Sequence, residues 1–208
     1  MSFSSSFPSS RSAAARFLPG PKGGRGLLPP AAGADENGQG VKMHTYAYAA
    51  QAAIVSVNIR TGEVTVDDTV LAVDVGHAIN PDTVEGQMHG GMAQAIGWSL
   101  MEEEFMKDGK MRNHTFHDYL IPTAMDLPKL RTIIVEHPNS LGPYGAKGVS
   151  EVATVPITPA ILNAVSRAIG VRINKVPASP EVILAAIRTG RCDVPTMAEQ
   201  VAALGENA

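Results

Sequence analysis

The sequence contains a single cysteine, Cys192, among its 208 residues. One thiol cannot form an internal disulfide, a zinc site built from cysteines, or an iron–sulfur cluster ligated by this chain alone. So little cysteine is typical of proteins in a reducing compartment, and we therefore expect a cytoplasmic location.

The sequence also lacks a large excess of charge of either sign, and it lacks long apolar runs. Lys and Arg number 17 and Asp and Glu number 20, which leaves a formal net charge of −3. This balance lacks the positive field of a nucleic-acid binder and the basic patch of a membrane-surface protein. No run approaches the roughly 18 consecutive apolar residues of a membrane-spanning helix. We therefore expect neither nucleic acid nor a membrane as a partner.

Glycine and proline are abundant, with 20 and 15 residues, and favour many turns of defined backbone geometry. The first forty residues contain seven Ser, seven Gly and five Pro, a composition that resists packed regular structure. We predict a disordered leader over 1–40, one folded unit over 41–190 and a tail over 191–208. The basic, acid-poor start of the leader also has the composition of a transit peptide, although an unstructured leader is the simpler interpretation.

The spacing of apolar residues predicts an α+β fold with a mixed arrangement of helices and strands. Two apolar runs, 54–59 and 64–75, flank a Thr-Gly turn and predict a β-hairpin. Asn80-Pro81-Asp82 is typical of a helix start, and an apolar residue at every fourth position predicts a long helix to about Phe105. The elements expected farther along are a buried strand at 131–137, a glycine-rich loop at 138–148, an interrupted helical region at 149–169, a short strand at 171–173 and a helix at 180–188.

Two glutamines and four glycines give the predicted long helix an unusual composition. Gln87 and Gln94 are two turns apart, so their side chains project from one face of the helix. Each glycine in a helix costs about 1 kcal/mol relative to alanine. The four glycines are Gly86, Gly90, Gly91 and Gly97. Close packing against the bare backbone offsets that cost. The group that packs there is either a neighbouring helix or a flat ligand bound by the two carboxamides.

The loop 142–151 is the second segment whose residues are suited to ligand binding or catalysis. It follows a predicted strand and opens a helical region, which places free backbone N–H groups beside Lys147 and Glu151. A phosphate-binding P-loop requires Ser or Thr directly after the lysine, and here Gly148 follows. Two interpretations of Glu151 then remain: a capping or salt-bridged carboxylate, and a general base in a pocket.

Four separated segments resemble one protein family. They are DVGHAINP at 74–81, EGQMHGGMAQ at 85–94, DYLIPT at 118–123 and GPYGAKGVSE at 142–151. Together they resemble the C-terminal part of the molybdopterin-binding large subunit of the molybdenum hydroxylases, the family of xanthine dehydrogenase, aldehyde oxidase and aerobic carbon monoxide dehydrogenase. The match runs in order from about residue 45 to residue 188, without large gaps.

The resemblance implies a molybdenum–molybdopterin cofactor whose metal is held by the pterin dithiolene rather than by protein side chains. By this similarity, Glu151 is the general base for a water-derived oxygen that attacks the substrate carbon, and Gln87 contacts the pterin. The backbone of Gly145, Ala146, Lys147, Gly148 and Val149 would line the cofactor. A general base works best with a pKa near the working pH, so we expect burial to raise the pKa of Glu151, with Lys147 as its counter-charge. Ser150 stands where family members often have glycine, and its hydroxyl is placed to hydrogen-bond the carboxylate or the molybdenum ligands.

The implied activity is that of a molybdopterin-dependent oxidoreductase that hydroxylates an aldehyde or an N-heteroaromatic substrate. Large subunits of the family are much longer, so we expect the chain to be inactive without partner polypeptide. The expected partners are the upstream part of the large subunit, an iron–sulfur subunit with the 2Fe–2S clusters and, in some members, an FAD subunit. Two alternatives stay open: a non-catalytic structural or assembly chain, and a truncated fragment that lacks the rest of the active site.

Overall fold

The structure of the chain is a computed structural model that describes residues 35–40 and 45–192. Its fold is α+β, which confirms the predicted class. Most of the predicted leader over 1–40 and nearly all of the predicted tail over 191–208 lie outside the described residues.

A three-stranded sheet forms the centre of the fold. The predicted hairpin is confirmed, because β1 (Ala49–Val57) pairs antiparallel with β2 (Val64–Asp74). Strand β5 (Lys129–Val135) pairs parallel with β2, which gives the order β1-β2-β5. The prediction of a buried strand at 131–137 was wrong about burial, since alternate side chains of β5 face solvent and Ile133 is 52% exposed. The cause is the position of β5 at the sheet edge with only one face on the core.

Helix α1 (Pro81–Leu100) begins where the sequence predicts. The Asn80 side chain accepts a hydrogen bond from the backbone N–H of Thr83 at 3.2 Å, as an N-cap residue does. The helix stops at Leu100 and does not reach Phe105. Consecutive glutamates follow at 102–104, and negative charge is unfavourable at the C-terminal end of a helix dipole. The first of them, Glu102, folds back and accepts a hydrogen bond from the Tyr119 hydroxyl at 2.7 Å.

The C-terminal region contains the expected helices but lacks the expected short strand. The region 149–169 is interrupted as predicted, with a short 3-10 turn, η2 (Glu151–Ala153), before α2 (Ile157–Ile169). Helix α3 (Pro180–Thr189) is confirmed. The expected strand at 171–173 is wrong, because the backbone N–H of Ile173 donates to the Ser166 hydroxyl and the segment joins neither of the two sheets formed by the described residues.

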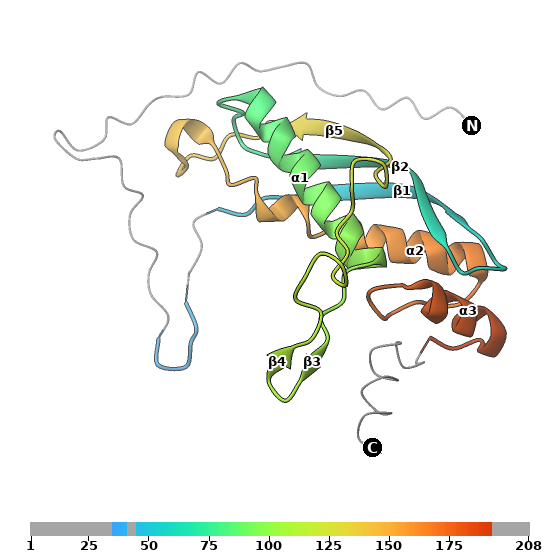
Figure 1. Ribbon diagram of the computed structural model, residues 1–208. Coiled ribbons are helices and arrows are strands. Elements are labelled where there is room, and N and C mark those ends of the chain that lie inside the picture. The colour runs from blue at the N-terminus through green and yellow to red at the C-terminus, as the bar shows by residue number, and fades with distance from the viewer. Residues whose placement is uncertain (1–34, 41–44, 193–208) are drawn as a thin grey trace, which may run out of the picture.

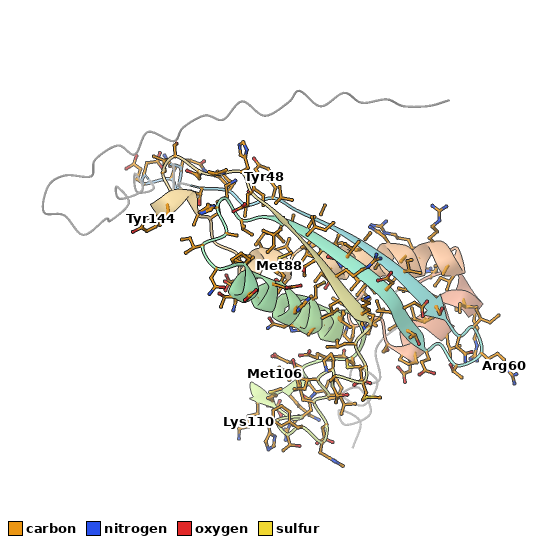
Figure 2. All side chains as sticks on the ribbon, turned by 90° about the horizontal axis from the view of Figure 1, so that it is seen from above. Tyr48, Arg60, Met88, Met106, Lys110 and Tyr144 are labelled. Atoms are coloured by element: carbon orange, nitrogen blue, oxygen red, sulfur yellow. The ribbon has the colours of Figure 1, made fainter. Side chains whose placement is uncertain are left out.

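The two longer helices cover one face of the sheet and enclose the core. Figure 1 shows α1 crossing in front of the strands and α2 running beside β1. Met88 lies between α1 and the sheet in Figure 2 and is fully buried. Within the described part of the chain, Glu151–Ile169 is the one stretch with the length and composition of a membrane span, and its residue Ile161 is fully buried in the core. The hairpin of β3 (Met106–Lys107) and β4 (Lys110–Met111) stands away from the sheet (Figures 1 and 2).

Candidate cofactor site

A cavity of about 530 Å³ lies between α1 and the segment that includes η2. Its lining from α1 is Gly86, Gln87, Gly90, Gly91, Gln94 and Trp98, and its lining from the η2 side is Ser150, Glu151 and Thr154. The volume is in the range of pockets that hold small molecules and cofactors. Two segments more than fifty residues apart in the sequence therefore form one concave site.

The spacing of the glutamines explains the α1 wall of the cavity. Gln87 and Gln94 lie two helical turns apart, and Trp98 follows one turn later, so the three side chains share one face. The sequence predicted the shared face of the two glutamines, and the structure agrees. The opposite face of α1 carries the buried Met88 and Met92, which fix the helix on the core.

The four glycines of α1 divide into two pairs with different roles. A Cβ atom at Gly91 would lie 2.7 Å from the Cβ of Ala153, and one at Gly97 would lie 2.7 Å from Cδ of Pro122. Those two glycines are required by close packing within the chain. A Cβ atom at Gly86 or Gly90 would meet no atom of the described residues within 4 Å, and both glycines line the cavity. This pair leaves a bare backbone floor, which suits a flat group lying against the helix.

The carboxylate of Glu151 lies on the wall opposite α1. The Ser150 hydroxyl donates a hydrogen bond of 2.5 Å to Oε2 of Glu151, as the sequence allowed. This bond and the glutamate's own backbone N–H outweigh a weaker effect of burial, and they hold the pKa of Glu151 below its ordinary value of 4.5. The expectation that burial raises this pKa was wrong for the described chain, because the Glu151 side chain is exposed at the cavity wall.

The glycine-rich loop that precedes Glu151 is tied to the end of strand β2. It contains a short 3-10 turn, η1 (Pro143–Gly145). The backbone N–H of His77 donates to the Gly145 carbonyl at 3.0 Å, and that of Lys147 donates to the Val75 carbonyl at 2.9 Å. The Lys147 ammonium forms an ion pair of 2.5 Å with Asp74 at the end of β2. The expectation that Lys147 is the counter-charge of Glu151 was therefore wrong.

The structure brings together part of the predicted site. Gln87 and Glu151 line the same cavity. The predicted backbone contacts, Gly145, Ala146, Lys147, Gly148 and Val149, are not part of its lining, and their role toward a cofactor stays a prediction. Sequence reasoning missed Thr154, which lies three residues after Glu151 and therefore one turn along the same helical wall.

Comparison with known proteins identifies the family. The family described as "Molybdopterin cofactor-binding domain" matches residues 22–128, about half of the chain. A probable xanthine dehydrogenase component of Bacillus subtilis (strain 168) is 41% identical over 142 residues, which are 68% of this chain. The "Aldehyde oxidoreductase" of Megalodesulfovibrio gigas is 38% identical over 154 residues, which are 73% of this chain. The chain therefore belongs to the molybdopterin-binding family of molybdenum hydroxylase large subunits, as its motifs indicated.

Solved structures of relatives have the same fold. The aldehyde oxidoreductase from Desulfovibrio gigas superposes with a TM-score of 0.70 at 36% identity over 76% of this chain. Quinoline 2-oxidoreductase from Pseudomonas putida 86 superposes with a TM-score of 0.63 at 40% identity over 67% of this chain. The chain spans only 19% of the Bacillus protein, 16% of the Megalodesulfovibrio protein and 17% and 18% of the two solved chains.

Proposed function

We propose that this chain supplies one wall of the active site of a molybdenum hydroxylase, with Glu151 as the general base and Gln87 as a contact of the molybdopterin cofactor. The observation that carries the proposal is the shared cavity: a carboxylate on one wall faces a helix whose glycine floor and paired carboxamides form the other. The family match supplies the chemical identity of the group that such a cavity would hold.

Each wall has its own task in this proposal. The carboxamides of Gln87 and Gln94 offer both donors and acceptors, which match the ring nitrogens and carbonyls of a pterin. Gly86 and Gly90 let the flat group approach the helix backbone. The molybdenum cofactor, when bound, supplies the two-electron oxidation of a substrate C–H group. The residues of this chain bind and orient, and Glu151 accepts a proton.

The ionisation of Glu151 fits the task of a base. Its pKa lies below the ordinary value of 4.5, so the carboxylate is deprotonated at neutral pH and ready to accept a proton. Covering the open side of the cavity with a second polypeptide would desolvate the carboxylate and raise its pKa toward the working pH, where a general base is most effective.

The proposed partners follow from the short span of this chain against its relatives. The upstream part of the large subunit would close the cavity, and an iron–sulfur subunit with 2Fe–2S clusters, with or without an FAD subunit, would carry electrons away. The one cysteine of this chain cannot ligate those clusters. The proposed substrate is an aldehyde or an N-heteroaromatic compound, with water as the source of oxygen.

The experiment that tests the proposal is Glu151→Gln in the assembled enzyme. Removal of a general base typically lowers turnover by about 10²- to 10⁴-fold. We expect that loss with aldehydes and N-heteroaromatic compounds as test substrates, while molybdenum and pterin contents stay at the wild-type level because Gln keeps the shape of the wall. Wild-type turnover by Glu151→Gln would refute the assignment. An assembled protein without molybdenum would favour the structural alternative.

A further inference from the structure

The residue before the proposed base makes a specific contact with it. Ser150 and Glu151 both line the cavity, and the Ser150 hydroxyl donates to Oε2 of Glu151 at 2.5 Å. A hydroxyl–carboxylate bond of this length is in the range of strong, charge-assisted hydrogen bonds. A glutamate side chain has several rotatable bonds, so such a bond restricts the directions in which the carboxylate points.

The other side chains in the described lining of the cavity do not restrict the Glu151 carboxylate in this way. Those from α1 are neutral, namely the two carboxamides of Gln87 and Gln94 and the indole of Trp98. On the η2 side, the Thr154 hydroxyl donates to the backbone carbonyl of Glu151 at 2.8 Å and not to its carboxylate. Glu151 is thus the one titratable side chain in the described lining.

Charged groups on the neighbouring elements are engaged elsewhere. Lys147, four residues before Glu151, is paired with Asp74 at 2.5 Å. On α1, His89 lies 3.7 Å from Glu85, and neither residue lines the cavity. Among the described residues, Ser150 is therefore the side chain that acts directly on the charge of Glu151.

We propose that Ser150 is a positioning residue for Glu151, whose hydroxyl holds the carboxylate in one orientation at the cavity wall. The inference rests on the proposed function for its catalytic meaning, because the positioned group is the proposed base. The hydrogen bond from Ser150 is also the largest cause of the low pKa of Glu151, so it keeps the carboxylate ionised to lower pH than glycine or alanine at position 150 would.

The direct test is a carboxylate titration of the full chain labelled with ¹³C at Glu Cδ, followed by NMR. Glu151→Gln identifies the resonance of Glu151 by its loss. We expect Ser150→Ala to raise the titration midpoint of Glu151 toward 4.5, and Ser150→Thr, which keeps the hydroxyl, to restore the wild-type midpoint. Thr154→Val is the matched control, because it removes a hydroxyl that does not contact the carboxylate, and it should leave the midpoint unchanged.

The same variants in the assembled, cofactor-loaded enzyme connect the contact to catalysis. We expect Ser150→Ala to shift the acid limb of the kcat/KM profile to higher pH and Ser150→Thr to return it. An unchanged NMR midpoint in Ser150→Ala, or an equal change in Thr154→Val, would overturn the role of Ser150 while leaving Glu151 as the base. Full turnover in Glu151→Gln would instead overturn the proposed function, whatever the titration shows.

Discussion

The Lys147 ammonium nitrogen lies 2.5 Å from Oδ2 of Asp74, and the two side chains are only 5% and 11% exposed. Asp74 ends strand β2, and Lys147 lies in the loop that leads to Glu151. The ammonium also lies 5.8 Å from the ring centroid of Tyr48, which Figure 2 labels at the same end of the sheet as Tyr144. The ion pair therefore fastens the loop before the proposed base to the central sheet.

Loss of one partner of this pair should destabilise the fold. Lys147→Met leaves the Asp74 carboxylate without its counter-charge, and breaking a buried pair in this way costs about 3–5 kcal/mol. We expect a loss near the lower end of that range in the free energy of unfolding, measured by urea denaturation. Lys110→Met in the exposed β3–β4 hairpin is the control and should change it by less than about 0.5 kcal/mol. Equal stability of both variants would show that the ion pair does not fasten the loop.

The pair should also make stability depend on pH. Burial acts to raise the pKa of Asp74, but the hydrogen bonds from Lys147 and the Gly76 N–H, with the lysine charge, outweigh it and lower the pKa below 3.8. The stability from this carboxylate is therefore present above about pH 3.8 and is lost as the pH falls through the lower, folded-state pKa.

The double variant Asp74→Asn/Lys147→Met isolates this contribution, because other carboxylates with lowered pKa values remain in both proteins. We expect wild type to lose more unfolding free energy than the double variant between neutral pH and the acid range below 3.8. Denaturant titrations across that range measure the difference. Parallel pH curves for the two proteins would contradict the prediction.

The glycines of α1 should respond to alanine in opposite directions. Gly91→Ala places a methyl group 2.7 Å from the Ala153 side chain, and we expect destabilisation of about 1–3 kcal/mol from overpacking. Gly86→Ala meets open space and should stabilise the helix by about 0.5–1 kcal/mol. Thermal and urea unfolding of the two variants provide the comparison. A loss of stability in Gly86→Ala would indicate that the space beside Gly86 in the cavity is not open in the folded chain.

Local features of the fold were predictable from the sequence because their causes are local. The cap at Asn80, the shared face of Gln87 and Gln94 and the hairpin depend on residues within a few positions of one another. The division of the glycines was not predictable, because it depends on Ala153, which lies sixty-two residues from Gly91 in the sequence.

Features that depend on distant partners were mispredicted. The sequence around Lys147 contains an acid at position 151, but the fold pairs the lysine with Asp74, seventy-three residues earlier. Among the described residues, no strand lies beside the expected strand at 171–173 to complete its hydrogen bonds. The pKa of Glu151 depends on solvent exposure, which pattern and spacing do not determine.

The most direct test of the central claim is the molybdenum and molybdopterin content of this chain purified in complex with the products of its neighbouring genes. We predict one molybdenum and one pterin per chain in the wild-type protein and in Glu151→Gln, because Gln preserves the cavity wall. Gly90→Leu fills the open floor of the cavity and should lower both contents together. A folded wild-type complex without molybdenum, or a Gly90→Leu complex with full cofactor content, would contradict the claim that this cavity holds the cofactor.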